Sequence, residues 1–140
     1  MKTTLICTAV LAIATSFSAL AKEATATCID SLASDGSLNL IADKVALAHS
    51  NQMASVRILD RVANEPERAA VALWLDKRQE CFDAGSKQRR AAFKPQEIAF
   101  ARSVFVFQQR LVADLQSGRL TYAEFNKRRL ELVDAAGHEI

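Results

Sequence analysis

The sequence predicts an all-α protein, a small helical bundle of three long helices and a shorter C-terminal helix with one disulfide. Three observations predict this class. Apolar residues recur at intervals of three and four along most of the chain, which is the period of an amphipathic helix. The 140 residues include only four glycines and two prolines, and no segment alternates as a strand does. Two cysteines remain once the N-terminal segment is removed.

Residues 1–21 are predicted to be a secretory signal peptide. Met1-Lys2 is basic, residues 5–20 are uncharged and mostly apolar, and Ala19 and Ala21 supply the small residues of a cleavage site. The apolar run of about 16 residues is shorter than the roughly 20 that a bilayer requires, which disfavours a membrane anchor. We expect cleavage after Ala21 and a periplasmic or secreted protein. Its mature chain would be a single helical domain, residues 22–140, without a transmembrane segment.

The mature chain keeps Cys28 and Cys81, because Cys7 leaves with the signal peptide. Two cysteines in an oxidising compartment usually pair, and only one intramolecular pairing is possible. Closing a loop of about 54 residues would stabilise the fold by roughly 4 kcal/mol in the chain-entropy model. A buried thiol and a separate free thiol are the alternative.

Two helices are expected in the first half of the mature chain. A short one over residues 24–33 carries Cys28 and ends at the turn residues 34–37. A long one over residues 39–63 is predicted by an apolar stripe that Gln52 alone interrupts. The stripe comprises Leu38, Ile41, Val45, Ala48, Val56, Leu59 and Val62.

Three further helices are expected after residue 63. Asn64 is a good N-cap and Pro66 suits a first turn, so a helix should run from there to about Ala84, with Cys81 on its apolar face. Residues 86–94 read as a loop or frayed extension. Pro95 begins the next long helix, which runs to about Leu115, and a final helix covers residues 122–136.

Phe105, Val106 and Phe107 make the third long helix apolar on more than one side. Two explanations are open. The helix is buried on two sides, or it presents an apolar face to a partner. We therefore take these three residues as a candidate apolar contact.

The stretch LQSGRLTYAEF, residues 115–125, has the spacing of half a calcium loop. Gly118, Leu120 and Glu124 match its sixth, eighth and twelfth positions. The first, third and fifth positions, where oxygen ligands are needed, hold Ala113, Leu115 and Ser117. Calcium binding is therefore not expected.

The same stretch is explained by helix-end chemistry. Gly118 suits the left-handed conformation that ends a helix. Thr121 and Glu124 have the spacing of a capping box, and Leu120 and Phe125 that of a hydrophobic staple. We expect residues 111–136 to form a C-terminal helical hairpin.

Residues 111–133, LVADLQSGRLTYAEFNKRRLELV, resemble the short C-terminal helical hairpin domain called SHOCT. The matching residues are Leu111, Leu115, Gly118, Leu120, Thr121, Glu124, Phe125, Lys127 and Leu130. Tyr122-Ala123 replaces the acidic pair often found there. The resemblance covers 23 residues, and it implies an interaction or oligomerisation element without a catalytic residue. The ending is also similar to those of small exported bacterial proteins of unknown role.

The sequence contains no pattern typical of a metal, haem or catalytic site. His49 and His138 are far apart, and no serine or cysteine nucleophile lies beside a base. We expect no cofactor, no metal and no enzymatic activity. The chain has 18 basic and 16 acidic residues, which does not favour a nucleic-acid partner.

Two basic clusters remain. One lies around residues 86–94, and the other is Lys127-Arg128-Arg129. Each is a solvated face or a contact for an anionic envelope surface or acidic partner. The candidate anion-contact patch comprises Lys77, Arg78, Lys87, Arg89, Arg90 and Lys94.

Together these features predict a non-catalytic binding or interaction protein that acts through helix-mediated contacts with a protein partner or with itself. The alternative is a periplasmic carrier or chaperone-like binder of an apolar or anionic ligand.

Overall fold

A computed structural model describes residues 24–49 and 54–136 of the chain. The expected signal peptide, Gln52 and His138 lie outside these residues. The described part contains helices and no strand, which confirms the predicted all-α class. The elements are α1 (Ala24–Ser31), the 3₁₀ turns η1 (Leu32–Ser34) and η2 (Gly36–Leu38), α2 (Glu65–Ala84), α3 (Ser86–Ala92), α4 (Pro95–Gln116) and α5 (Tyr122–Ala136).

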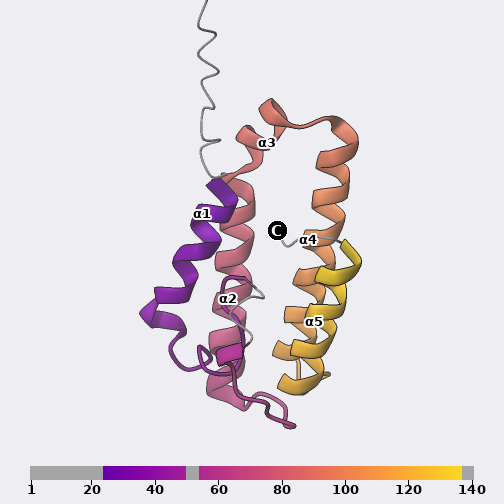
Figure 1. Ribbon diagram of the computed structural model, residues 1–140. Helices are drawn as coiled ribbons and strands as arrows, with labels where there is room; N and C mark the ends of the chain where they lie inside the picture. Colours follow the sequence, from indigo (N-terminus) through magenta and orange to yellow (C-terminus); the bar gives the residue numbers. More distant parts are fainter. Residues whose placement is uncertain (1–23, 50–53, 137–140) are drawn as a thin grey trace, which may run out of the picture.

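The three longest helices, α2, α4 and α5, run side by side in alternating directions (Figure 1). α2 packs against α4, and α4 packs against α5. α1 packs on α2 on the side away from α4, and α3 joins α2 to α4 at one end of the molecule (Figure 1). The result is a small bundle in which α2 is central.

The expected cap of α2 is present. Asn64 Oδ1 accepts a hydrogen bond of 3.0 Å from the Glu67 backbone N–H, and Glu67 Oε2 accepts one of 2.9 Å from the Asn64 N–H. This capping box satisfies two amides that lack intrahelical partners. α2 then continues to Ala84, as predicted.

Residues 86–94 were expected to form a loop or a frayed extension, and the loop is wrong for residues 86–92, which form α3. Gly85 has φ −80° and ψ −7°, a right-handed conformation, and does not turn the chain away. Its N–H donates to the Cys81 carbonyl, and its own carbonyl accepts from the Arg89 N–H. The helical hydrogen-bond pattern therefore continues through Gly85 into α3.

The long helix expected over residues 39–63 is also wrong, as the described residues of that segment show. Residues 39–44 form turns, and after the bond from Val45 N–H to the Ile41 carbonyl the helical pattern stops. Val45, Ala46, Leu47 and Ala48 are all buried. A helix with one apolar stripe does not bury four consecutive residues, and Val62 of the expected stripe is exposed.

The buried segment 44–48 is held by side chains from α2 and α5. Its carbonyl oxygens accept four hydrogen bonds: Asn126 donates to Lys44, Trp74 to Leu47, and Arg129 to both Ala46 and Ala48. In a helix these carbonyls would accept from amides four residues later. Because distant side chains supply the donors here, the segment is buried without forming a helix.

Residues 59–61, which are irregular, supply hydrogen-bond acceptors to the first backbone amides of α5. The Leu59 carbonyl accepts from the Ala123 N–H at 2.9 Å, and the Arg61 carbonyl accepts from the Tyr122 N–H at 3.1 Å. The first amides of a helix have no partner within the helix. Residues 59–61 therefore act as an external cap for α5.

Trp74 of α2 lies at the centre of the core. Its ring is fully buried and meets the Phe125 ring edge-on, with centroids 6.0 Å apart and planes at 75°. The same cluster contains Ile29 from α1, Leu115 from α4, and Val45 from segment 44–48. The core thus joins α1, α2, α4 and α5 through segment 44–48 as well as through direct helix contacts.

Candidate functional site

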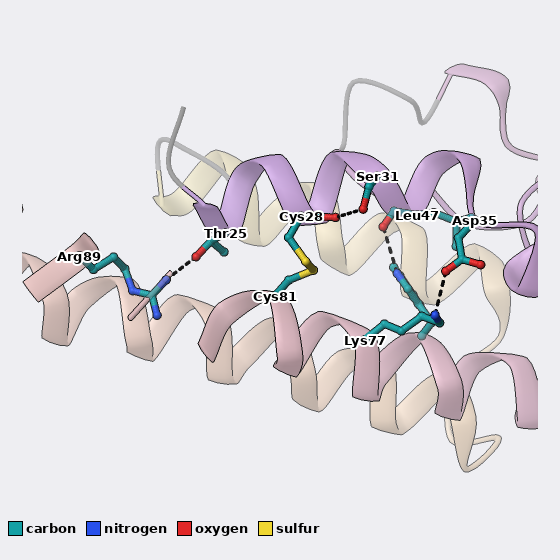
Figure 2. The surroundings of a disulfide bond; sticks show 9 residues. Thr25, Cys28, Ser31, Asp35, Leu47, Lys77, Cys81 and Arg89 are labelled. Atoms are coloured by element: carbon teal, nitrogen blue, oxygen red, sulfur yellow. Dashed lines mark hydrogen bonds and ion pairs between the residues drawn. A yellow bond between two sulfur atoms is a disulfide. The ribbon is translucent and has the colours of Figure 1, made fainter. Parts of the chain in front are cut away.

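The disulfide between Cys28 and Cys81 joins α1 to α2, with the two Cα atoms 5.3 Å apart (Figure 2). This confirms the predicted pairing. Farther along the same interface, Lys77 Nζ lies 2.9 Å from Asp35 Oδ2. Hydrogen bonds to Asp35, first from the Ser37 side chain and then from Lys77, lower the pKa of this carboxyl to about 2. Lys77 is therefore engaged by an acid of its own chain.

Two members of the expected anion-contact patch are interior residues. Arg78 is 1 % exposed and Arg89 is 4 % exposed. Neither belongs to a surface patch, so for these two the expectation is wrong. Lys87, Arg90 and Lys94 are exposed, as a contact patch requires.

Arg78 is buried between α2 and α4. Its Nη2 donates to Gln108 Oε1 at 2.7 Å and its Nε donates to Gln109 Oε1 at 3.2 Å. Its guanidinium also lies over the Trp74 and Phe105 rings, at 5.4 and 5.9 Å from their centroids. Amide oxygens and aromatic faces are the neutral partners that a buried guanidinium can use.

Arg89 of α3 is held in a similar way. Its guanidinium stacks on the Phe82 ring, 3.8 Å from the centroid, and it donates to the Phe82 carbonyl and to Thr25 Oγ1. Figure 2 shows Arg89 reaching from α3 to Thr25 at the start of α1. The residue fixes one end of α1 on the opposite side of the disulfide from Asp35.

The three residues of the candidate apolar contact differ in burial. Phe105 is buried and stacks on Phe82, with centroids 4.0 Å apart, so it is a core residue and the expectation for it is wrong. Val106 and Phe107 are exposed, Phe107 by 55 %. Arg110 lies over the Phe107 ring at 5.6 Å.

Sequence reasoning missed two further exposed aromatic residues, Phe93 and Phe100. Phe93, Phe100 and Phe107 are seven residues apart, which places Phe100 and Phe107 on one side of α4. This spacing is the signal that would have found them. All the exposed phenylalanines of the described residues lie in this stretch.

The same stretch is strongly basic. Residues 86–110 contain six basic residues and one acidic residue, Glu97. We call the exposed basic and large apolar residues of this stretch the α3–α4 surface. Its members are Lys87, Arg90, Phe93, Lys94, Phe100, Arg102, Val106, Phe107 and Arg110, and the exposed Glu97 lies among them. In Figure 1, α3 and the first turns of α4 form one end of the molecule.

The C-terminal hairpin has the expected local geometry. Gly118 has φ +77°, Thr121 Oγ1 accepts from the Glu124 N–H at 3.2 Å, and Glu124 Oε2 accepts from the Thr121 N–H at 2.9 Å. The latter bond is the main cause that lowers the pKa of Glu124. Leu120 and Phe125 are both buried in the core. The apolar side chains of this motif are thus used inside the molecule, while Thr121 and Glu124 cap the start of α5.

Glu67 is a buried carboxylate that pairs with two cations. Its carboxylate accepts two hydrogen bonds from Arg61, of 2.6 and 2.7 Å, and Lys44 Nζ lies 3.7 Å away. The hydrogen bond from Arg61 is the main reason that the pKa of Glu67 falls to about 2. Burial and the Glu67 charge raise the pKa of the neighbouring Tyr122. A carboxylate with so low a pKa is a poor general base near neutral pH.

Two hollows flank α4. A shallow groove of about 410 Å³ lies between α2 and α4, where Gln79, Gln109 and Arg110 stand beside Leu75 and Val106. The accessible surface of its lining is more apolar than polar, as the carrier alternative requires, but the groove is open to solvent and does not enclose a ligand. A smaller pocket of about 80 Å³ lies between α3 and α4.

Comparison with protein families, with curated proteins and with solved structures finds no match to this chain. Within residues 24–49 and 54–136, no three histidine, cysteine or acidic side chains gather as metal ligands would. No helix in the same residues has the length and apolar character needed to cross a bilayer.

Proposed function

We propose that this protein is an exported, non-catalytic binding protein that contacts an acidic protein partner through the α3–α4 surface. The observation that carries the proposal is the coincidence of exposed aromatic rings and unopposed basic side chains on this surface. Phe93, Phe100 and Phe107 offer apolar area, and Arg90 and Arg102 offer charge.

Aromatic residues and arginine are the residue types that contribute most to protein interfaces. Both residue types occur together at Phe107, because the Arg110 guanidinium lies over the Phe107 ring. When a partner covers such a ring, the buried apolar area supplies affinity, and the surrounding charges orient the partner. A partner that fits this surface carries apolar residues flanked by aspartate or glutamate.

The positive charge of this surface also opposes self-association through it. A two-fold dimer would bring two copies of a stretch with six basic residues and one acidic residue together. Like charges that face one another oppose association. We therefore take a different, acidic chain as the partner, in preference to a second copy.

The proposal places the protein outside the cytoplasm. The N-terminal sequence has the features of a signal peptide, and the Cys28–Cys81 disulfide is of the kind that persists in oxidising compartments. The disulfide would help the protein, and with it the binding surface, to stay folded outside the cytoplasm.

Site-specific photo-crosslinking in envelope extract tests the contact. A photoreactive residue replaces Ser103, which is exposed on α4 between Phe100 and Phe107, and a second protein carries it at Lys127 on α5. We expect Ser103 to capture a protein whose crosslinked segment is acidic, and Lys127 not to capture it. Capture should fall at about 1 M salt, where the Debye length is about 3 Å.

The matched variants are Phe100→Ser with Phe107→Ser, and Ile58→Ser as the control. Ile58 is 89 % exposed and lies outside the α3–α4 surface. The double variant should lose capture, and the control should retain it. Equal capture by all three proteins, crosslinks only between two copies of the chain, or crosslinks only to lipid would each overturn the proposal.

A further inference from the structure

The pocket between α3 and α4 is lined almost entirely by cations and apolar walls. Its residues are Phe82, Ser86, Arg89, Arg90, Ile98 and Arg102. Three of the six are arginines, one is a hydroxyl donor, and none is acidic. The pocket volume of about 80 Å³ is several times the roughly 10–15 Å³ that a cavity needs to hold one water molecule. A single small anion fits this space.

Arg89 gives the pocket a rigid wall. The Phe82 ring, the Phe82 carbonyl and Thr25 Oγ1 fix its guanidinium, and the side chain is almost wholly buried. A side chain that is already ordered loses little conformational entropy when a ligand arrives. Arg89 therefore adds a fixed, largely buried positive charge to the lining of the pocket.

Arg90 and Arg102 complete the pocket from its two helices. Both are exposed, and no ion pair or hydrogen bond of either side chain is found among the described residues. Glu97, the single acid of residues 86–110, accepts a hydrogen bond of 2.7 Å from the Lys94 backbone N–H. The two outer guanidinium groups are thus available to a ligand.

We propose that this pocket binds one tetrahedral oxyanion, a phosphate or sulfate group. A guanidinium offers a planar set of N–H donors that matches phosphate oxygens with two parallel hydrogen bonds. Arg90 supplies such donors from α3 and Arg102 from α4, Ser86 adds a hydroxyl, and Arg89 adds charge. The group is either a free ion or the terminal phosphate of a lipid headgroup. The site shares Arg90 and Arg102 with the partner contact proposed above, but it does not use Phe100 or Phe107.

Isothermal titration of the mature protein with inorganic phosphate, at constant ionic strength held with sodium chloride, tests the site. We expect saturable binding of one anion per chain. Arg90→Gln with Arg102→Gln should weaken it at least about tenfold, equivalent to about 1.4 kcal/mol. The control removes the same charge from α5, as Lys127→Gln with Arg128→Gln, and should bind as the parent does.

Three results would overturn the site: no saturable binding of phosphate or sulfate, an equal loss in both double variants, or no loss in either. The thermal midpoint should be unchanged in both, because all four side chains are exposed. Phe100→Ser with Phe107→Ser should still bind phosphate, so that failure of the partner contact is distinguishable from failure of the site.

Vesicles distinguish the two sources of the anion. Binding to vesicles that contain phosphatidic acid, competed by inorganic phosphate and lost in the Arg90→Gln, Arg102→Gln variant, assigns the site to a lipid headgroup. Binding of inorganic phosphate without vesicle binding assigns it to the free ion. Both outcomes support the shared oxyanion chemistry.

Discussion

Arg129 of α5 donates a hydrogen bond of 2.8 Å from Nη2 to the carbonyl oxygen of Ala48. Its Nη1 donates to the carbonyl of Ala46, and its guanidinium lies 5.7 Å from the Trp74 ring centroid. One side chain near the C-terminus therefore organises a segment more than 80 residues earlier.

Arg129→Ala should destabilise the protein by about 3 kcal/mol or more, because it leaves two buried carbonyls without these donors. Arg129→Lys should be intermediate, since one ammonium group cannot reproduce the paired geometry. Urea denaturation followed by circular dichroism measures both. Arg128→Ala is the matched control, because Arg128 is exposed and adjacent, and it should change stability by less than about 0.5 kcal/mol. Equal midpoints for Arg128→Ala and Arg129→Ala would contradict the assignment.

Gly118→Ala should cost about 1–2 kcal/mol, the usual penalty of a left-handed conformation for a residue with a side chain. The added Cβ would also lie 2.6 Å from Arg68 Nη2, so the Arg68 side chain would have to move. Gly36→Ala is the control, because its Cβ would meet no atom closer than 3.8 Å. Thermal denaturation of the two variants should separate them clearly, and a neutral Gly118→Ala would refute the explanation.

Cys28→Ala with Cys81→Ala should lower stability by up to about 4 kcal/mol, since the unfolded chain regains the loop entropy. Hydrogen exchange should increase more in α1 than in α2, because α1 would keep only its noncovalent contacts with α2. Thiol titration of the denatured, unreduced mature protein should find no reactive thiol. Two reactive thiols would show that the disulfide does not form in solution.

Glu67 should make stability depend on pH in the acid range. Its folded pKa of about 2 lies below its ordinary value of 4.5. The stabilisation of the ionised form is therefore fully present above about pH 4.5 and is lost as the pH falls toward 2. Its size is about 3 kcal/mol. Glu67→Gln should lower stability at pH 7 and flatten the loss between pH 4.5 and 2. Parallel pH curves for the parent and the variant would exclude this role.

Features that depend on neighbouring residues could be predicted from the sequence. α2, α4 and α5 begin and end where Asn64, Pro95 and Gly118 predict, because caps and helix ends are made within one turn of the chain. The disulfide followed from counting, since the mature chain has one possible pair.

Only the tertiary structure decided the features that depend on partners far along the chain. Segment 44–48 carries a helical pattern, yet it is irregular because Trp74, Asn126 and Arg129 supply donors to its carbonyls. No local rule contains these side chains.

The same reason explains the candidate sites. Sequence placed Arg78 and Arg89 on the surface because cations are usually solvated, but Gln108, Phe82 and Thr25 give them buried partners. Burial of a charge depends on what the fold brings within hydrogen-bond distance of it. Packing against α2 likewise buried Phe105 and left Phe107 exposed, although the two residues are alike in sequence.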